Sequence, residues 1–298
     1  MAAKGPDWWA NRGSLLLAQA LGEERFPVEV ERLALDWSKA IDPAEPITRI
    51  RGRGLEGFEG ALIDGRKNGN GWGIVYDEQI ARRSPGRMRF TIAHELGHYL
   101  LHRHLAAGTG FTCGSRDMTA WDYDRQPREV EANRFAAGIL MPLNDFRSQL
   151  PARDGATMET LSELAEDRYG VSLTACILRW LDYTARQAIL VASRDGYALW
   201  AKSSQAAFRN GRFIRTRNGP PFEIPSASPT MSSDLTDVSG SQVRHPSGVW
   251  FDAPVVEDVI CSARLELNLS LLTFDGNGPA TIHDDEGELD VLDRMKLR

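Results

Sequence analysis

Apolar residues recur at helical spacing over residues 8–21 and 27–40, which predicts two N-terminal helices. Pro27 suits the first turn of the second helix. Three shorter apolar runs follow at residues 47–50, 58–63 and 71–76, separated by glycine-rich turns such as Asp64-Gly65. These runs predict a small antiparallel sheet.

Two longer helical patterns follow the predicted sheet. The first begins near Ser84-Pro85 and runs to about His104, and the second covers residues 128–142. A polar, glycine-containing stretch over residues 105–126 separates them. Loops of this length in compact domains are usually functional, so we expect this one to lie over or beside a site on the first helix.

Residues 161–181 have the pattern of two helices with a turn at Tyr169-Gly170, and Ser172 is placed to begin the second helix. This segment therefore resembles a helix-turn-helix. Between Glu159 and Asp182 it carries five acidic and two basic residues, however, which is the wrong balance for contacts with DNA phosphates.

The pattern changes to strands after residue 184. Runs at 188–193 and 197–202 flank Asp195-Gly196, and Asp-Gly tolerates the positive φ angles of a tight hairpin turn. Further strands are predicted at residues 248–251 and 265–274, separated from the hairpin by a serine- and proline-rich loop over 220–247.

These elements predict an α+β protein with three parts. Residues 1–150 would form a mostly helical domain with a small antiparallel sheet, and residues 151–185 a helix-turn-helix-like segment packed on that domain. Residues 186–298 would form a smaller β-rich module that senses a signal, binds a partner or only stabilises the first domain.

Two histidines and a glutamate share one turn of the first long helix. Each residue advances a helix by about 100°, so His94 and His98 lie on one ridge with Glu95 beside them. Two imidazoles at this spacing can chelate zinc, and the carboxylate is placed to take a proton from a metal-bound water. Gly97 costs the helix about 1 kcal/mol relative to alanine, which suggests that another element packs closely there. The alternative is an amphipathic helix whose histidines are incidental.

A catalytic zinc ion takes three protein ligands, and the second long helix offers two carboxylates for the third position. Glu129 is the better choice because it shares a ridge with Asn133, which could orient the other ring nitrogen of a histidine. Glu131 points about 160° away around the helix and is expected to be solvated or salt-bridged. A different roll of the helix would exchange the two roles. One Zn²⁺ per chain is predicted, although two imidazoles and a carboxylate also suit Mn²⁺ or Fe²⁺.

Two other side chains are candidates for contact with a substrate. His102 lies one more turn along the metal-binding ridge and could contact the substrate or support a ligand, although such a histidine is more often solvated or bonded to backbone. Tyr123, in the long polar stretch, could donate a hydrogen bond to an oxyanion or could simply pack as an aromatic residue.

Together, the two long helices resemble the ImmA/IrrE family of zincin-like metallopeptidases. The matching stretches are TIAHELGHYLLH at 91–102 and EVEANRFAAGILMP at 129–142, and the resemblance covers about residues 25–185. It implies a zinc-dependent endopeptidase of narrow specificity that cuts a helix-turn-helix transcriptional repressor and so releases genes of a mobile element or a stress response. By position, the family's ligands correspond to His94, His98 and Glu129, with Glu95 as the general base.

In zinc peptidases the substrate commonly binds as an extra strand along the edge of a sheet, beside the helix that carries the metal-binding histidines. Residues 72–76 are the candidate for such an edge, with a covered core strand as the alternative. Two other functions remain compatible with the motif. One is a toxin or defence effector paired with a repressor-like antitoxin, and the other is a module that binds a repressor without cutting it and uses zinc only for structure.

Composition limits the partners and the cellular compartment that the protein can have. The chain has 298 residues, 42% of them hydrophobic, and a formal net charge of -6, which argues against general affinity for nucleic acid or anionic membranes. Its three cysteines are odd in number and widely spaced, so neither a disulfide framework nor a zinc knuckle is predicted. No apolar run approaches the roughly 18 residues of a membrane span. We therefore expect a cytoplasmic protein.

Overall fold

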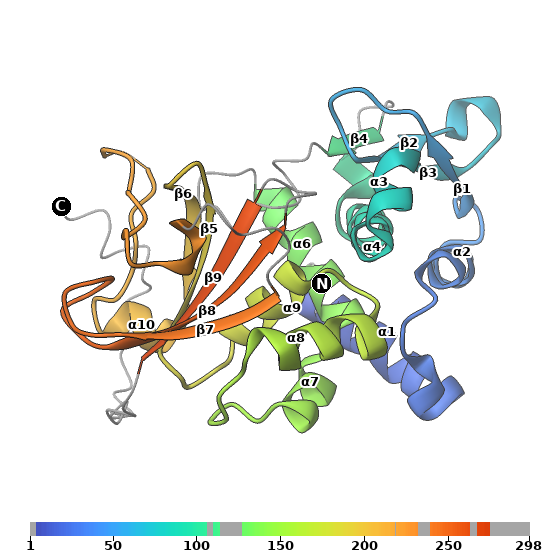
Figure 1. The fold of residues 1–298 in the computed structure, drawn as a ribbon. Helices are drawn as coiled ribbons and strands as arrows, with labels where there is room; N and C mark the ends of the chain where they lie inside the picture. The colour runs from blue at the N-terminus through green and yellow to red at the C-terminus, as the bar shows by residue number, and fades with distance from the viewer. Residues whose placement is uncertain are drawn as a thin grey trace, which may run out of the picture.

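The computed structural model describes residues 4–105, 110–113, 127–217, 219–231, 239–262 and 267–274. Helices and a four-stranded sheet come first along the chain, and a five-stranded antiparallel sheet follows (Figure 1). This arrangement confirms the predicted α+β class with a β-rich C-terminal part. In the described ranges, no helix is both long enough and apolar enough to cross a membrane.

The helices agree closely with the hydrophobic pattern. The α-helices are Pro6–Leu21 (α1), Val30–Ile41 (α2), Glu78–Arg83 (α3), Pro85–His102 (α4), Pro127–Leu140 (α6), Leu143–Gln149 (α7), Met158–Glu163 (α8), Leu173–Leu181 (α9) and Gln205–Arg209 (α10). Short 3-10 turns cover Gly22–Arg25, Arg66–Asn68, Arg103–Leu105 and Pro229–Met231, and a π-helical turn (η4) covers Leu164–Tyr169. The structure differs from the prediction in two ways: α3, α7 and α10 were not predicted, and α2 begins at Val30, so Pro27 precedes the helix.

The four-stranded sheet has the order β1-β3-β2-β4. Its strands are Ile47–Arg53 (β1), Gly60–Asp64 (β2), Trp72–Asp77 (β3) and Gly110–Cys113 (β4). The predicted strands are present, but the sheet is not wholly antiparallel: β2 and β3 form a hairpin, and β1 lies parallel to β3 on its far side. The proposed edge at residues 72–76 is wrong for the same reason, because β3 has a partner on both sides and Trp72 is fully buried.

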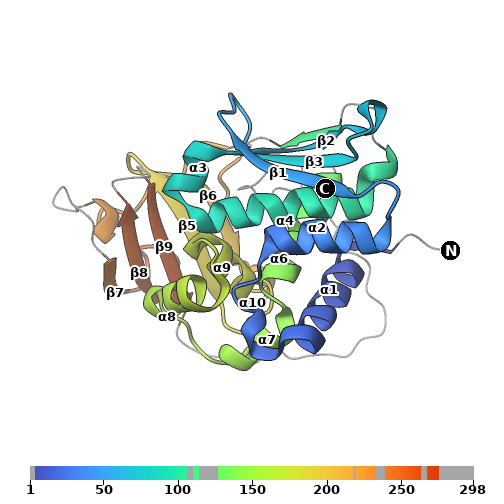
Figure 2. The ribbon, with the colours of Figure 1, turned by 90° about the vertical axis from the view of Figure 1, so that its right-hand side faces the viewer.

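Helix α4 lies between this sheet and the other helices. Figure 2 shows it running along one face of the sheet, with α2 and α6 on its other sides. A shared core unites apolar side chains of the sheet, α4 and α6, among them Leu62, Ile92 and Phe135. A Cβ added at Gly97 would lie 3.2 Å from the Cα of Ala132, so the glycine allows α6 to approach α4 closely, as predicted.

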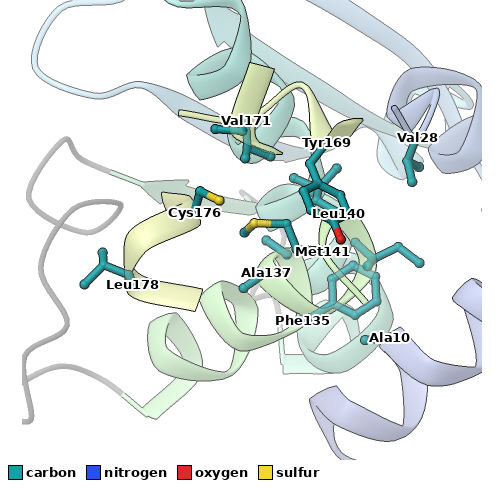
Figure 3. Close-up of a cluster of buried hydrophobic side chains, with 14 of the residues drawn as sticks. Ala10, Val28, Phe135, Ala137, Leu140, Met141, Tyr169, Val171, Cys176 and Leu178 are labelled. Carbon is teal, nitrogen blue, oxygen red and sulfur yellow. The ribbon is translucent and has the colours of Figure 1, made fainter. Parts of the chain in front are cut away.

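The helix-turn-helix-like segment is part of the same core. Gly170 has a positive φ of 59° at the turn, and Ser172 caps α9 by accepting a hydrogen bond from the N–H of Ala175 at 3.2 Å. Figure 3 shows Tyr169 and Cys176 directed toward the α6 end of this core, beside Leu140 and Met141. The apolar face of α9 therefore packs against the helical core.

The C-terminal sheet has the order β6-β5-β9-β8-β7. Its strands are Ala188–Arg194 (β5), Tyr197–Ser203 (β6), Ser239–His245 (β7), Val255–Ser262 (β8) and Leu267–Phe274 (β9). Asp195 and Gly196 both have positive φ, of 51° and 79°, and form the predicted hairpin turn. One face of β5 joins the helical core through residues such as Leu190, while Val191 on the other face belongs to a second core with Trp250.

One strand prediction and one loop prediction in this region are wrong, and β8 was not predicted. Residues 248–251 form a turn, which the positive φ of Gly248 favours, and β7 lies inside the stretch assigned to a long loop. The buried carboxylate of Glu257 on β8 explains why pattern alone misses these strands. It accepts hydrogen bonds from His245 at 2.8 Å and from Trp250 at 3.0 Å, so a charged residue occupies a core position.

Candidate metal centre

Helix α4 buries His94, Glu95 and His98 completely, and α6 brings Glu129 to the two histidines. The Nε2 atoms of His94 and His98 lie 2.9 Å apart. The carboxylate oxygens of Glu129 lie 3.2 Å from Nε2 of His94 and 3.4 Å from Nε2 of His98. His94, His98 and Glu129 therefore form a candidate metal site, with Glu95 on the same helical turn.

The contact of His94 with Asn133 fixes the direction of its lone pair. Oδ1 of Asn133 lies 2.9 Å from Nδ1 of His94. An amide oxygen only accepts hydrogen bonds, so this contact requires the ring proton on Nδ1. Nε2 of neutral His94 then directs a lone pair toward His98 and Glu129.

His98 is oriented in the same way by a chain of two further residues. Nε2 of His102 lies 2.9 Å from Oε2 of Glu131, and Nδ1 of His102 lies 3.0 Å from Nδ1 of His98. A carboxylate accepts the Nε2–H proton of His102, so Nδ1 of neutral His102 must accept from Nδ1–H of His98. This leaves the lone pair of His98 on Nε2, pointing at its partner histidine. His102 and Glu131 thus set the tautomer of His98, while Glu131 stays apart from the three convergent groups.

The donor set fits a tetrahedral zinc ion. Two imidazole lone pairs and a carboxylate point at one another from 2.9 to 3.4 Å, an arrangement that is repulsive unless a positive charge lies among them. Ligand atoms bonded to zinc at about 2.0 Å in tetrahedral geometry lie about 3.3 Å apart, close to these separations. The nitrogen and oxygen donors match the preference of zinc, whose catalytic sites take three protein ligands.

The ionisation of these groups points the same way. Burial would lower the pKa of His94, but the adjacent carboxylates of Glu129 and Glu95 outweigh burial and raise it, so its Nε2 attracts a positive charge, either a proton or a metal ion. Burial lowers the pKa of His98 to about 4, so the second imidazole stays neutral at pH 7. Burial would raise the pKa of Glu129, yet the two histidines beside its carboxylate hold it well below its usual range. The site therefore favours an ionised carboxylate and a positive charge.

Gly60 on β2 is a site residue that sequence reasoning missed. A Cβ added there would lie 2.4 Å from Cγ2 of Thr91 and 2.9 Å from Oε1 of Glu95. Only glycine allows β2 to approach the metal helix this closely at Glu95. The sequence gives a weak signal, a glycine inside the predicted strand over residues 58–63, which often marks close approach of another group.

The remaining sequence candidates are placed as follows. Asn133 contacts His94, and His102 contacts both His98 and Glu131. Tyr123 lies outside the described residues.

Comparison with known proteins agrees with this site. Residues 71–181 match the IrrE N-terminal-like domain, a peptidase family, and the matched segment contains all three groups of the candidate metal site. The structure also resembles that of a Mycobacterium tuberculosis transcriptional regulator, with a TM-score of 0.52 and 12% sequence identity over 89% of this chain and 76% of that chain, which shows a similar fold. No curated protein matches the sequence. Residues 71–181 of this chain therefore belong to the IrrE N-terminal-like domain family.

Proposed function

We propose that this protein is a zinc-dependent endopeptidase that hydrolyses a peptide bond in a specific protein substrate. His94, His98 and Glu129 would hold the metal ion, and Glu95 would act as the general base. The observation that carries the proposal is the convergence of two imidazole lone pairs and a carboxylate beside a second, fully buried carboxylate. That combination is the ligand set and base of a hydrolytic zinc site.

Each residue has a separate task in the reaction. A bound zinc ion lowers the pKa of water and polarises a carbonyl group. Glu95 accepts the proton of the attacking water and later delivers it to the leaving amine. Asn133 holds His94 in its ligand tautomer, and the Glu131–His102 pair does the same for His98. These contacts keep the two imidazoles oriented during turnover.

Strand β4 is our candidate for the strand that aligns the substrate. It pairs with β2 and, among the described strands, lies at one edge of the four-stranded sheet. Cys113 at its end is opposite Gly60, which lies against Glu95. An extended peptide that adds to the free edge of β4 would therefore pass beside the base.

A helix-turn-helix transcriptional repressor is the proposed substrate class. The family of the catalytic segment and the transcriptional regulator of similar fold support a role in gene control. Direct DNA recognition is not part of the proposal, because α8, η4 and α9 carry mostly acidic charge and bury their apolar faces. Cys176 and Cys261 are free thiols, which fits the reducing cytoplasm.

The test compares cells that express the wild-type protein with cells that express Glu95→Gln. Glu78→Gln, on α3 and outside the site, serves as the matched control. We expect a truncated protein in wild-type and Glu78→Gln cells that stays intact with Glu95→Gln. Purified wild-type protein should then cut the same substrate. A chelator should abolish this cleavage, and added zinc should restore it.

Other outcomes would replace this function. A partner that binds tightly and stays intact with zinc present would show sequestration without cleavage. Growth arrest that requires Glu95, together with a truncated host protein and an intact repressor, would indicate a toxin or defence effector.

A further inference from the structure

Strand β1 carries a row of three arginines on one face of the four-stranded sheet. Arg49, Arg51 and Arg53 alternate along the strand, and all three are exposed. Alternate residues of a strand point to the same face, so the side chains of the row start about 6.6 Å apart. Among the described residues, none of the three side chains has a hydrogen bond or an ion pair.

The strand beside this row does not neutralise it. Two of the arginines lie opposite the uncharged Gly73 and Val75 of β3. The third, Arg53, lies opposite Asp77, whose carboxylate caps α3 by accepting a hydrogen bond from the N–H of Gln79 at 2.7 Å. The row is therefore a line of positive charge on a chain whose formal net charge is -6.

Strand β1 is also an edge of the sheet. It pairs with β3 on one side, and no other described strand pairs with its second side, as Figure 1 shows. The backbone N–H and C=O groups on the unpaired side of an edge strand can bind an added strand. The opposite face of β1 presents Ile50, which packs against the helical core. An added strand that fits this edge therefore carries carboxylates on one face and apolar residues on the other.

The sequence of residues 284–291, which lie outside the described ranges, has this complementary pattern. Acidic residues occupy every second position: Asp284, Glu286, Glu288 and Asp290. Leu289 and Val291 occupy alternate positions in the same stretch. In a strand, the four carboxylates would share one face with the spacing of the arginine row, and the two apolar side chains would share the other face.

We propose that residues 284–291 of one copy of this chain add as a strand to the free edge of β1 in a second copy. The carboxylates pair with the arginine row, and Leu289 and Val291 lie on the side of Ile50. Arginine and carboxylate form strong charge-assisted hydrogen bonds, and cross-strand pairs of opposite charge stabilise a sheet. This inference goes beyond the proposed peptidase function and does not depend on it.

The positions of the two surfaces favour a second copy as the source of the strand. The last described residue, Phe274, belongs to the C-terminal sheet, and Figure 1 shows that sheet and β1 on opposite sides of the helices. The ten backbone steps from Phe274 to Asp284 span at most about 36 Å. A compact chain of this length has a radius of gyration of about 19 Å and is therefore about 50 Å across. A second copy presents the segment without this limit, and because the two surfaces differ, the contact is head-to-tail.

The first test is sedimentation velocity of the full chain from about 1 µM to about 100 µM. Wild-type protein should associate as its concentration rises. A rise in salt from about 0.05 M to about 0.5 M should weaken this association by about tenfold, because salt screens exposed charge pairs. A wild-type protein that stays monomeric would overturn the proposal and would leave the arginines as charges that only keep the edge unpaired.

Two charge-reversed variants identify the two surfaces. The first reverses the row on β1 and carries Arg49→Glu, Arg51→Glu and Arg53→Glu. The second reverses the segment and carries Glu286→Lys, Glu288→Lys and Asp290→Lys. Each variant alone should associate at least about tenfold more weakly than wild type, because like charges then lie opposite each other. An equal mixture should recover association, since each variant supplies the surface that is complementary to the other.

The matched control reverses three exposed cations elsewhere and carries Lys39→Glu, Arg153→Glu and Arg209→Glu. It has the same net charge as the first variant and should associate like wild type. Thermal unfolding verifies that each variant is folded. Wild-type association of either charge-reversed variant, a mixture as weak as its components, or equal weakening in the control would refute the pairing.

A cross-linking experiment tests the position of the contact. Full-length chain in which Leu289 is replaced by the photo-cross-linker p-benzoylphenylalanine is mixed with isotope-labelled wild-type chain. Mass spectrometry should find cross-links to residues 47–53 of the labelled copy. Cross-links that avoid this strand, or that join residues of one copy only, would overturn the proposal. Glu95→Gln should associate like wild type, so the result is separate from that of the peptidase test.

Discussion

Gly60→Ala isolates the contact between the four-stranded sheet and Glu95, the proposed general base. The new methyl group would meet Cγ2 of Thr91 at 2.4 Å and Oε1 of Glu95 at 2.9 Å. An ordinary contact needs at least about 3.4 Å, so β2 and α4 must separate by about 1 Å at this point. The nearest atoms to the methyl group belong to none of His94, His98 and Glu129, so the proposed ligands should move little.

Two magnitudes follow from this geometry. Insertion of a methyl group into a packed interface costs about 1–3 kcal/mol, which should appear as a lower free energy of unfolding. A catalytic group misplaced by up to about 1 Å can lose about 100-fold in rate. The variant should therefore show slower substrate cleavage at unchanged zinc content.

Urea unfolding, zinc analysis and the rate of substrate cleavage measure these effects. Gly54→Ala is the matched control, because a Cβ there meets nothing within 4 Å. It should match wild type in all three measurements. The reasoning would be refuted if Gly60→Ala were as stable and as active as Gly54→Ala. It would also be refuted if Gly60→Ala lost its zinc, because the change should act on Glu95 and not on the ligands.

Two further predictions concern contacts around the site and in the core. Asn133→Leu should weaken zinc binding by about 10–100-fold, measured by chelator competition, because the variant no longer accepts the Nδ1–H proton of His94. Asp145→Asn should lower the free energy of unfolding by about 1.5–3 kcal/mol at pH 7, because the carboxylate accepts hydrogen bonds from Arg168 at 2.8 Å and Tyr169 at 2.7 Å. Burial opposes ionisation of Asp145, but these bonds hold its pKa below 3.8, so urea titrations should show the wild-type advantage above pH 3.8 and its loss as the pH falls further.

Local patterns predicted those elements whose signals are contained in a few residues. The period of α4 and α6, the small residue at Gly97 and the Asp195-Gly196 turn each depend on neighbours along the chain. The ridge shared by Glu129 and Asn133 follows from helix geometry alone. Both face α4 in the structure, so helical phase was sufficient to bring these two residues together with the histidines.

Features that depend on distant partners were not accessible from the pattern. The parallel pairing of β1 with β3 is decided by where the β2–β3 hairpin docks, and no single strand encodes it. The strand around Glu257 could not be predicted from the hydrophobic pattern, because a glutamate predicts a solvent-exposed position. Its burial depends on partners such as His245 and Ser270, which lie elsewhere in the sequence. The same is true of the Glu131–His102 contact, which joins two helices.

The most direct test of the metal centre is the zinc affinity of Glu129→Gln measured beside that of Glu131→Gln. Wild-type protein should bind one zinc ion per chain, and Glu129→Gln should bind it more than about 100-fold more weakly, since it loses a ligand. Glu131→Gln should remain within about tenfold of wild type, because the glutamine oxygen can still accept the proton of His102. Wild-type affinity in Glu129→Gln, or loss of zinc in Glu131→Gln alone, would contradict the proposed ligand set.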